Sequence, residues 1–119
     1  MSDAEIKIYQ GDAIKLEMHI VDEEGKDFDL TDFESLQFMV KSNKSDINAD
    51  ALLSKTEADI VVVNATAGKL ELQLKYDDTK GITIGRNWYE LQLYDSGNDI
   101  EYTPLQGYFT VMEKVLDVG

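Results

Sequence analysis

The side chains that could do chemistry are few, and the single histidine, His19, is the first of them. It lies in an alternating run two residues after Glu17, so both side chains belong to the same face of a strand. A general base or a metal ligand at this position would need a carboxylate or a second ligand held against the ring. One carboxylate nearby is common in an acidic protein, so we expect His19 to be solvated and without a function.

Two acidic turns are the next candidates, because clustered carboxylates could gather oxygen ligands around calcium. They are Asp22-Glu-Glu and the segment 95–99, Asp-Ser-Gly-Asn-Asp. Neither fits the twelve-residue calcium loop, with its ordered ligand positions and its final bidentate glutamate. Turn-forming chemistry accounts for the same residues. The chain has no cysteine for a thiolate metal site, and no motif supplies a nucleophile with its base, a metal cluster or a phosphate loop. We therefore expect no metal site, no cofactor and no enzymatic activity.

Aromatic side chains are the third group. Trp88, Tyr94 and Tyr108 share the outward parity of their predicted strands, and Tyr102 is a fourth candidate for an interface. Exposed aromatics that group together mark a protein interface or a sugar-binding face. Alternatively, residues 42–57 cover them and make them a second core layer, because parity does not say what lies above a sheet. Both interpretations remain open at this point.

These residues must be positioned by short strands, because apolar and polar residues alternate repeatedly between Gly, Asn and Asp turns. The alternating apolar sets are Ile6 and Ile8; Ile14, Leu16, Met18 and Ile20; Leu36, Phe38 and Val40; Leu70, Leu72 and Leu74; Tyr89, Leu91 and Leu93; and Phe109 and Val111. The β-branched run 60–63 predicts a further strand. We predict an all-β fold, an immunoglobulin-like antiparallel β-sandwich of about seven to nine strands, with residues 1–119 as a single domain.

Two connections have less regular patterns. Residues 49–55 could form two helical turns capped by Asn48, or a short strand could pass through Leu52 and Leu53. Both alternatives remain open. The polar segment 76–81 is compatible with a single helical turn before the final strands.

The composition limits the class of partner. The 24 acidic and 11 basic residues give a net charge of −13, a field that repels nucleic acid and anionic membrane surfaces. No apolar segment is long enough to span a bilayer, and the acidic start lacks the basic residues of a signal peptide. We therefore expect a cytosolic product that binds neither nucleic acid nor membranes.

Several short motifs occur in an order and spacing that resemble a known family. They are Tyr9-Gln-Gly-Asp12, Asp22-x-x-Gly25, Asp29-Leu-Thr31, Gly68-x-Leu70-x-Leu72, Trp88-Tyr-x-Leu91-x-Leu93 and Leu105-Gln-Gly107-x-Phe109-x-Val111. Together they resemble the N-terminal domain of phage baseplate upper proteins. Ala13 departs from the threonine expected after Gly-Asp, and the chain ends at Gly119, where such a protein would continue.

The resemblance implies a non-catalytic module of a phage or prophage virion that mediates assembly between proteins. Its partners would be other virion or tail proteins, in a homo-oligomer and without a small-molecule ligand. Such a protein would be made in the host cytoplasm and located in the virion. A carbohydrate-binding β-sandwich that stacks sugars on Trp88, Tyr94 and Tyr108 is the alternative.

Overall fold

The computed structural model describes residues 2–3, 5–31, 33–43, 45, 51–95, 97 and 100–113. The strands are β1 (Ser2–Asp3), β2 (Ile6–Tyr9), β3 (Ile14–His19), β4 (Ser35–Lys41), β5 (Leu53–Thr56), β6 (Ile60–Asn64), β7 (Lys69–Leu74), β8 (Gly85–Asp95) and β9 (Ile100–Met112). One short helix, α1 (Tyr76–Thr79), lies between β7 and β8. The prediction of an all-β sandwich is confirmed.

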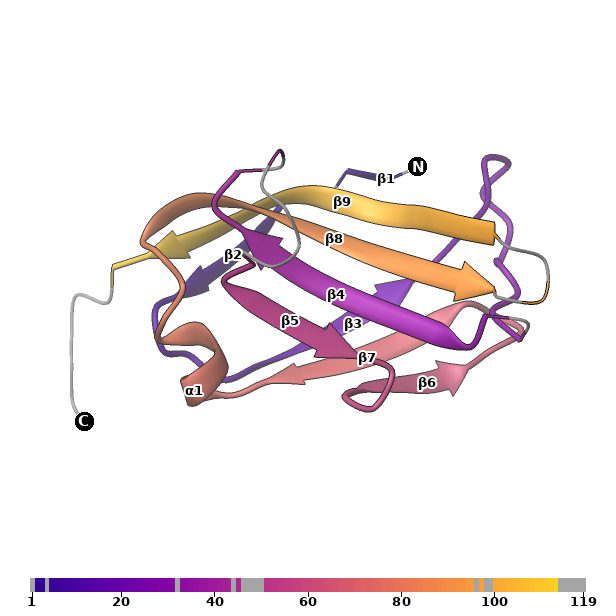
Figure 1. The fold of residues 1–119 in the computed structure, drawn as a ribbon, viewed down its shortest axis with the longest axis horizontal. Coiled ribbons are helices and arrows are strands. Elements are labelled where there is room, and N and C mark those ends of the chain that lie inside the picture. Colours follow the sequence, from indigo (N-terminus) through magenta and orange to yellow (C-terminus); the bar gives the residue numbers. More distant parts are fainter. Residues whose placement is uncertain are drawn as a thin grey trace.

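The strands form two sheets, and Figure 1 shows β9, β8, β4 and β5 side by side in the larger one. Its order is β1-β9-β8-β4-β5, and β2 also pairs with β9; the smaller sheet has the order β3-β7-β6. The pairs β3–β7, β4–β5, β4–β8, β6–β7 and β8–β9 are antiparallel, as predicted, whereas β1 and β2 run parallel to β9. They pair with a strand that is distant in sequence, where no hairpin turn imposes an antiparallel direction.

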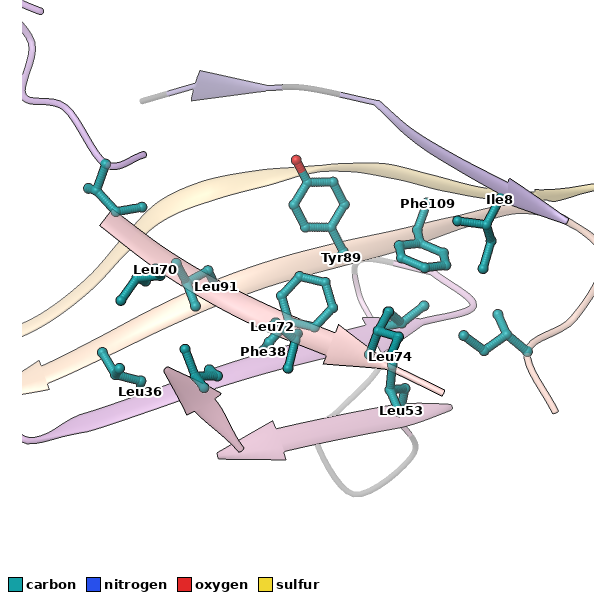
Figure 2. Close-up of a cluster of buried hydrophobic side chains, with 14 of the residues drawn as sticks. Ile8, Leu36, Phe38, Leu53, Leu70, Leu72, Leu74, Tyr89, Leu91 and Phe109 are labelled. Carbon is teal, nitrogen blue, oxygen red and sulfur yellow. The ribbon is translucent and has the colours of Figure 1, made fainter. Parts of the chain in front are cut away.

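The core lies between the sheets and is built from the alternating apolar residues. Leu70, Leu72 and Leu74 of β7 face Phe38 of β4 and Leu91 of β8, and all five side chains are at most 1 % exposed. Figure 2 shows these side chains filling the space between the two layers. The Phe38 and Tyr89 rings stack at a centroid distance of 5.7 Å. The period-2 pattern therefore identified the inner face of each of these strands.

Gly68 allows one close approach at the start of β7. Its φ of +70° is costly for other residues, and a Cβ atom there would lie 2.5 Å from the Ile20 carbonyl oxygen and 2.7 Å from that of Phe28. Its own carbonyl accepts a hydrogen bond of 2.8 Å from the Ile20 backbone amide. The absence of a side chain thus brings the connection after β3 against the smaller sheet.

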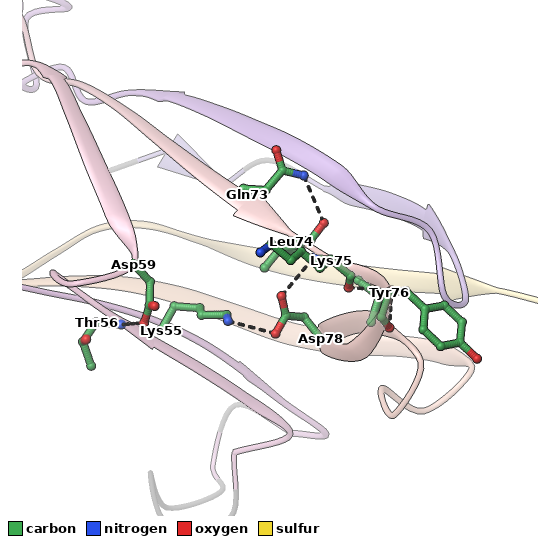
Figure 3. A network of polar contacts seen from close by, with 9 residues as sticks. Lys55, Thr56, Asp59, Gln73, Leu74, Lys75, Tyr76 and Asp78 are labelled. Atoms are coloured by element: carbon green, nitrogen blue, oxygen red, sulfur yellow. Dashed lines mark hydrogen bonds and ion pairs between the residues drawn. The ribbon is translucent and has the colours of Figure 1, made fainter.

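An ion pair links β5 of the larger sheet to the helical turn α1. Lys55 of β5 lies 2.8 Å from Asp78 of α1, and both side chains are about four-fifths buried. Figure 3 shows that Asp78 also accepts a hydrogen bond from the Lys75 backbone amide, at 2.8 Å.

The structure also shows the conformation of the two connections whose sequence patterns are less regular: residues 53–56 form a strand and residues 76–79 a helical turn. The alternative Asn48 cap lies outside the described residues.

Candidate functional site

Three residues on the outer face of the larger sheet form a contiguous group, which we call the aromatic–arginine cluster: Arg86, Trp88 and Tyr108. Trp88 of β8 lies directly opposite Tyr108 of β9, and the two rings meet edge to face at a centroid distance of 5.5 Å. The Arg86 guanidinium carbon lies 4.6 Å from the Tyr108 ring centroid, within cation–π range. Arg86 and Trp88 are the chain's only arginine and only tryptophan, and strand periodicity places both on one face.

A carboxylate beside the cluster orients the tryptophan ring. The Trp88 indole Nε1 donates to one carboxylate oxygen of Glu90 at 3.2 Å, and the Gln92 amide donates to the other oxygen at 3.2 Å. The Lys41 ammonium of β4 approaches the same carboxylate to 4.0 Å. The Lys41 and Glu90 side chains are only 6 % and 15 % exposed. The outer face of this sheet is thus partly desolvated around the cluster.

A recess of about 350 Å³ borders the cluster on the side of the chain that follows β4. It is lined by Ser42, Asn43, Ser45, Arg86, Asn87, Trp88 and Tyr108. The Asn87 amide is held by a hydrogen bond of 2.9 Å to the Thr83 carbonyl oxygen. Part of the 42–57 segment therefore lies beside the aromatic rings, as the covered-layer interpretation supposed, yet Tyr108 remains 46 % exposed. Residues 46–50 lie outside the described part of the chain.

A second carboxylate lies near the arginine. Glu5 accepts a hydrogen bond of 2.7 Å from the hydroxyl of Thr110, the residue directly opposite Arg86 in β9. This hydrogen bond lowers the pKa of Glu5, and the charges of Lys7 and Arg86 act in the same direction. An ionised carboxylate therefore lies near the stacked cation and the two rings of the aromatic–arginine cluster.

The four predicted interface residues do not form one patch. Tyr94 is 38 % exposed on the same face as Trp88, but six residues along β8, which is about 20 Å in a strand. Tyr102 points toward the core, where its ring stacks on Phe28 at a centroid distance of 5.3 Å. In the sequence, Tyr102 is an interface candidate together with Tyr108, but the two rings lie on opposite faces of the sheet. The reason is a register irregularity between β8 and β9, near Leu91 and Leu93, that reverses the parity of β9.

His19 lies on the outer face of the smaller sheet, away from the aromatic–arginine cluster. Its Nε2 is 2.7 Å from a carboxylate oxygen of Asp27, not of Glu17, and the histidine and aspartate side chains are about half exposed. Asp27 reaches it because the turn after β3 folds back, with an isolated bridge between Val21 and Asp27. Sequence proximity could not indicate this partner, since the contact depends on the turn.

The aspartate carboxylates of the acidic turns accept hydrogen bonds from nearby backbone amides. One Asp22 carboxylate oxygen accepts from the backbone amides of Glu24 and Lys26, each at 2.9 Å. An Asp95 oxygen accepts from the Gly97 amide at 3.0 Å, while residues 98 and 99 are outside the described part. Among the described residues, no group of three or more His, Cys, Asp or Glu side chains could hold a metal ion. None of the described helices is long and apolar enough to cross a membrane.

Comparisons with known proteins identify no family. No family model matches the chain, and no curated protein matches it. Among solved structures, the chain is similar to CopC from Methylosinus trichosporium OB3b, with a TM-score of 0.46 and 11 % sequence identity over 97 % of this chain and 91 % of that one. At this TM-score and identity, nothing about the function of CopC is transferred to this chain.

The function predicted from the sequence does not stand. The solved structure named above, CopC, is one of several chains that match, and it is not a phage baseplate protein. The prediction of a phage or prophage structural module is wrong, and the carbohydrate-binding alternative gains no support either. A function has to be argued from the geometry of the chain itself.

Proposed function

We propose that this chain is a non-catalytic binding domain that recognises a protein partner through the aromatic–arginine cluster. One observation carries the proposal: the chain's only arginine and only tryptophan meet Tyr108 on one face of the larger sheet. Arginine, tryptophan and tyrosine are the residue types most enriched among the few that dominate interface energies. Their contiguity beside a recess distinguishes this surface from scattered exposed aromatics.

The cluster is held in place before any partner arrives. Glu90 accepts a hydrogen bond from the Trp88 indole, and the ring of Tyr108 packs against the edge of Trp88. Side chains that are already ordered lose less conformational entropy on binding, so more of the contact energy appears as affinity. Preorganisation of this kind supports a binding role for the surface.

The chemistry of the cluster suggests what it would contact. A guanidinium stacked on a tyrosine ring still presents its N–H donors at the edge of the plane. These donors suit carboxylates and backbone carbonyl oxygens, and the neighbouring rings suit apolar side chains. A partner segment with an apolar residue next to an acidic side chain or an exposed carbonyl group would match both features.

The proposal is tested by comparing two tyrosines that resemble each other. Tyr108 and Tyr76 are 46 % and 60 % exposed, and each lies beneath a cation: Arg86 at 4.6 Å and Lys80 at 5.3 Å, respectively. A partner captured with the wild-type chain is purified, and its affinity is measured by calorimetry for Tyr108→Ala and for the control Tyr76→Ala. We expect a loss of about 2 kcal/mol, roughly thirtyfold in Kd, for Tyr108→Ala alone.

Two results would contradict the proposal. If Tyr108→Ala and Arg86→Ala bind the purified partner as tightly as the wild type, the contact surface lies elsewhere. If Tyr76→Ala weakens binding as much as Tyr108→Ala, the loss of affinity does not report on the cluster. Circular dichroism of each variant ensures that the comparison is made between folded proteins.

A further inference from the structure

Strand β6 (Ile60–Asn64) lies at the edge of the smaller sheet. In the described part of the chain it pairs only with β7, and Figure 1 shows it at the lower margin of the sandwich. Its three central residues, Val61, Val62 and Val63, are 59 %, 43 % and 57 % exposed. An edge strand presents backbone N–H and C=O groups on its outer side, and here exposed β-branched side chains flank them.

This edge has little of the protection that natural edge strands carry. Charged side chains, proline and bulges usually prevent such strands from pairing with other chains. The opposite edge of the same sheet, β3, presents Lys15, Glu17 and His19. By contrast, residues 60–68 contain no charged residue and no proline, and a bulge between Val62 and Asn64 is the one such device in β6.

We infer that β6 pairs with β6 of a second copy of this chain, antiparallel, to join two three-stranded sheets across a two-fold axis. The charges that flank the strand favour this arrangement. Antiparallel pairing centred on Val62 places Asp59 opposite Ala65, so no like charges face each other. Parallel pairing in register would instead place Asp59 opposite Asp59. The two-fold contact is also self-complementary, because Val61 meets Val63 of the second copy.

The size and charge of the protein predict how this dimer behaves. A strand of five residues buries little surface, so the dimer is weak and dependent on protein concentration. Each copy carries a net charge of −13, and the repulsion between copies is screened by salt. Added salt therefore strengthens the dimer, whereas it would weaken the binding of a basic peptide at the same edge.

The test is sedimentation velocity on the wild-type chain and on two lysine variants of matched exposure. Val62→Lys places two ammonium groups directly opposite each other in the dimer, whereas Ile84→Lys, at 47 % exposure against 43 %, introduces the same charge away from β6. We expect a concentration-dependent dimer for the wild type and for Ile84→Lys. For Val62→Lys we expect the dimer Kd to rise by about tenfold or more.

A second variant covers the case in which Val62→Lys fails to fold. The double substitution Val61→Lys and Val63→Lys alters only side chains that are more than half exposed, and pairs lysine with lysine in the proposed register. A wild-type chain that stays monomeric at its solubility limit in high salt would overturn the inference. So would a dimer that both β6 variants leave intact. Because Tyr108 is not part of β6, Tyr108→Ala should leave the dimer unchanged, which separates this result from the proposed function.

Discussion

The outer faces of the two sheets each carry a lysine–glutamate pair, and the two pairs lie in opposite environments. On the larger sheet, Lys41 and Glu90 are 6 % and 15 % exposed at a separation of 4.0 Å. On the smaller sheet, Lys15 and Glu71 are 51 % and 31 % exposed at 3.4 Å. The shorter contact is the more solvated one. Distance alone therefore does not rank these pairs, because the cost of removing one partner depends on how far the other is desolvated.

The difference extends to what each face can do. The larger sheet surrounds Glu90 with an indole donor, an amide donor and an ammonium group, so its outer face resembles a partly formed interior. The smaller sheet presents lysine, glutamate and histidine to solvent around a recess of about 430 Å³. An ordered, half-buried surface suits specific recognition, whereas a solvated charged surface mainly maintains solubility.

The largest expected difference in stability is between substitutions on the two sides of β8. Leu91 is fully buried on the inner side, and Leu91→Ala should destabilise the fold by roughly 2–5 kcal/mol, because the resulting cavity does not collapse completely. Trp88→Ala, on the outer side, should leave the chain folded and remove partner binding. Urea denaturation of both variants measures the difference. Equal destabilisation would show that the outer face of the larger sheet is a second core layer and not a binding surface.

The next prediction separates the two ion pairs. Among the described residues, Lys41→Met leaves the buried Glu90 carboxylate with only the neutral donors of Trp88 and Gln92, so we expect a loss of about 3 kcal/mol. Lys15→Met leaves Glu71 solvated and should change the stability by about 0.5 kcal/mol or less. Denaturant midpoints of the two variants, measured side by side, give the comparison. Similar losses would mean that burial does not distinguish the two faces.

A smaller effect concerns Lys55 and Asp78, the ion pair between β5 and α1. Burial raises the pKa of Asp78, but the hydrogen bonds from Lys55 and from the Lys75 backbone amide, with the charges of both lysines, hold it below its usual value. A lowered carboxyl pKa contributes stability that is fully present above the unfolded-state pKa.

That contribution should disappear as the pH falls below about 4 and through the lowered pKa of Asp78. Asp78→Asn should cost about 1 kcal/mol at neutral pH, between the values for exposed and buried pairs. The difference from the wild type should shrink in acid. Urea titrations at several pH values measure it, and a difference that stays constant into strong acid would show that Asp78 acts through packing and not through its charge.

The inner faces of the strands could be predicted from the sequence because a strand alternates with a period of two. Leu70, Leu72 and Leu74 are all buried, as their spacing indicates. The outer faces could not be predicted in this way. Met39 has outward parity, yet it is 1 % exposed, because burial on the outer side depends on what lies over the sheet.

The register of the strands and the pairing of distant segments could not be predicted from the sequence either. The irregularity between β8 and β9 turns Tyr102 inward and leaves Tyr108 outward, although both have even numbers in one strand. Pro104 lies in β9 between Tyr102 and Leu105, at the site of this irregularity, and a proline within a strand is a signal of a bulge. The size of the register shift still depends on the pairing with β8. The contacts of His19 with Asp27 and of Arg86 with Tyr108 depend in the same way on which segments lie side by side.

The smallest expected effect is on the outer face of the smaller sheet, where His19 and Asp27 are in contact but about half exposed. Zinc or calcium should leave the melting temperature unchanged, because two solvated side chains do not supply the three or four ligands of a typical protein metal site. A metal at a hundredfold its Kd would add about 2.7 kcal/mol of stability, which shifts the melting temperature of a domain of this size by several degrees.

His19→Gln serves as the control, since it removes the imidazole ligand at an exposed position. A rise in melting temperature with zinc that disappears in His19→Gln would place a metal site on this face, and the contrast between a binding face and a solvating face would then no longer hold.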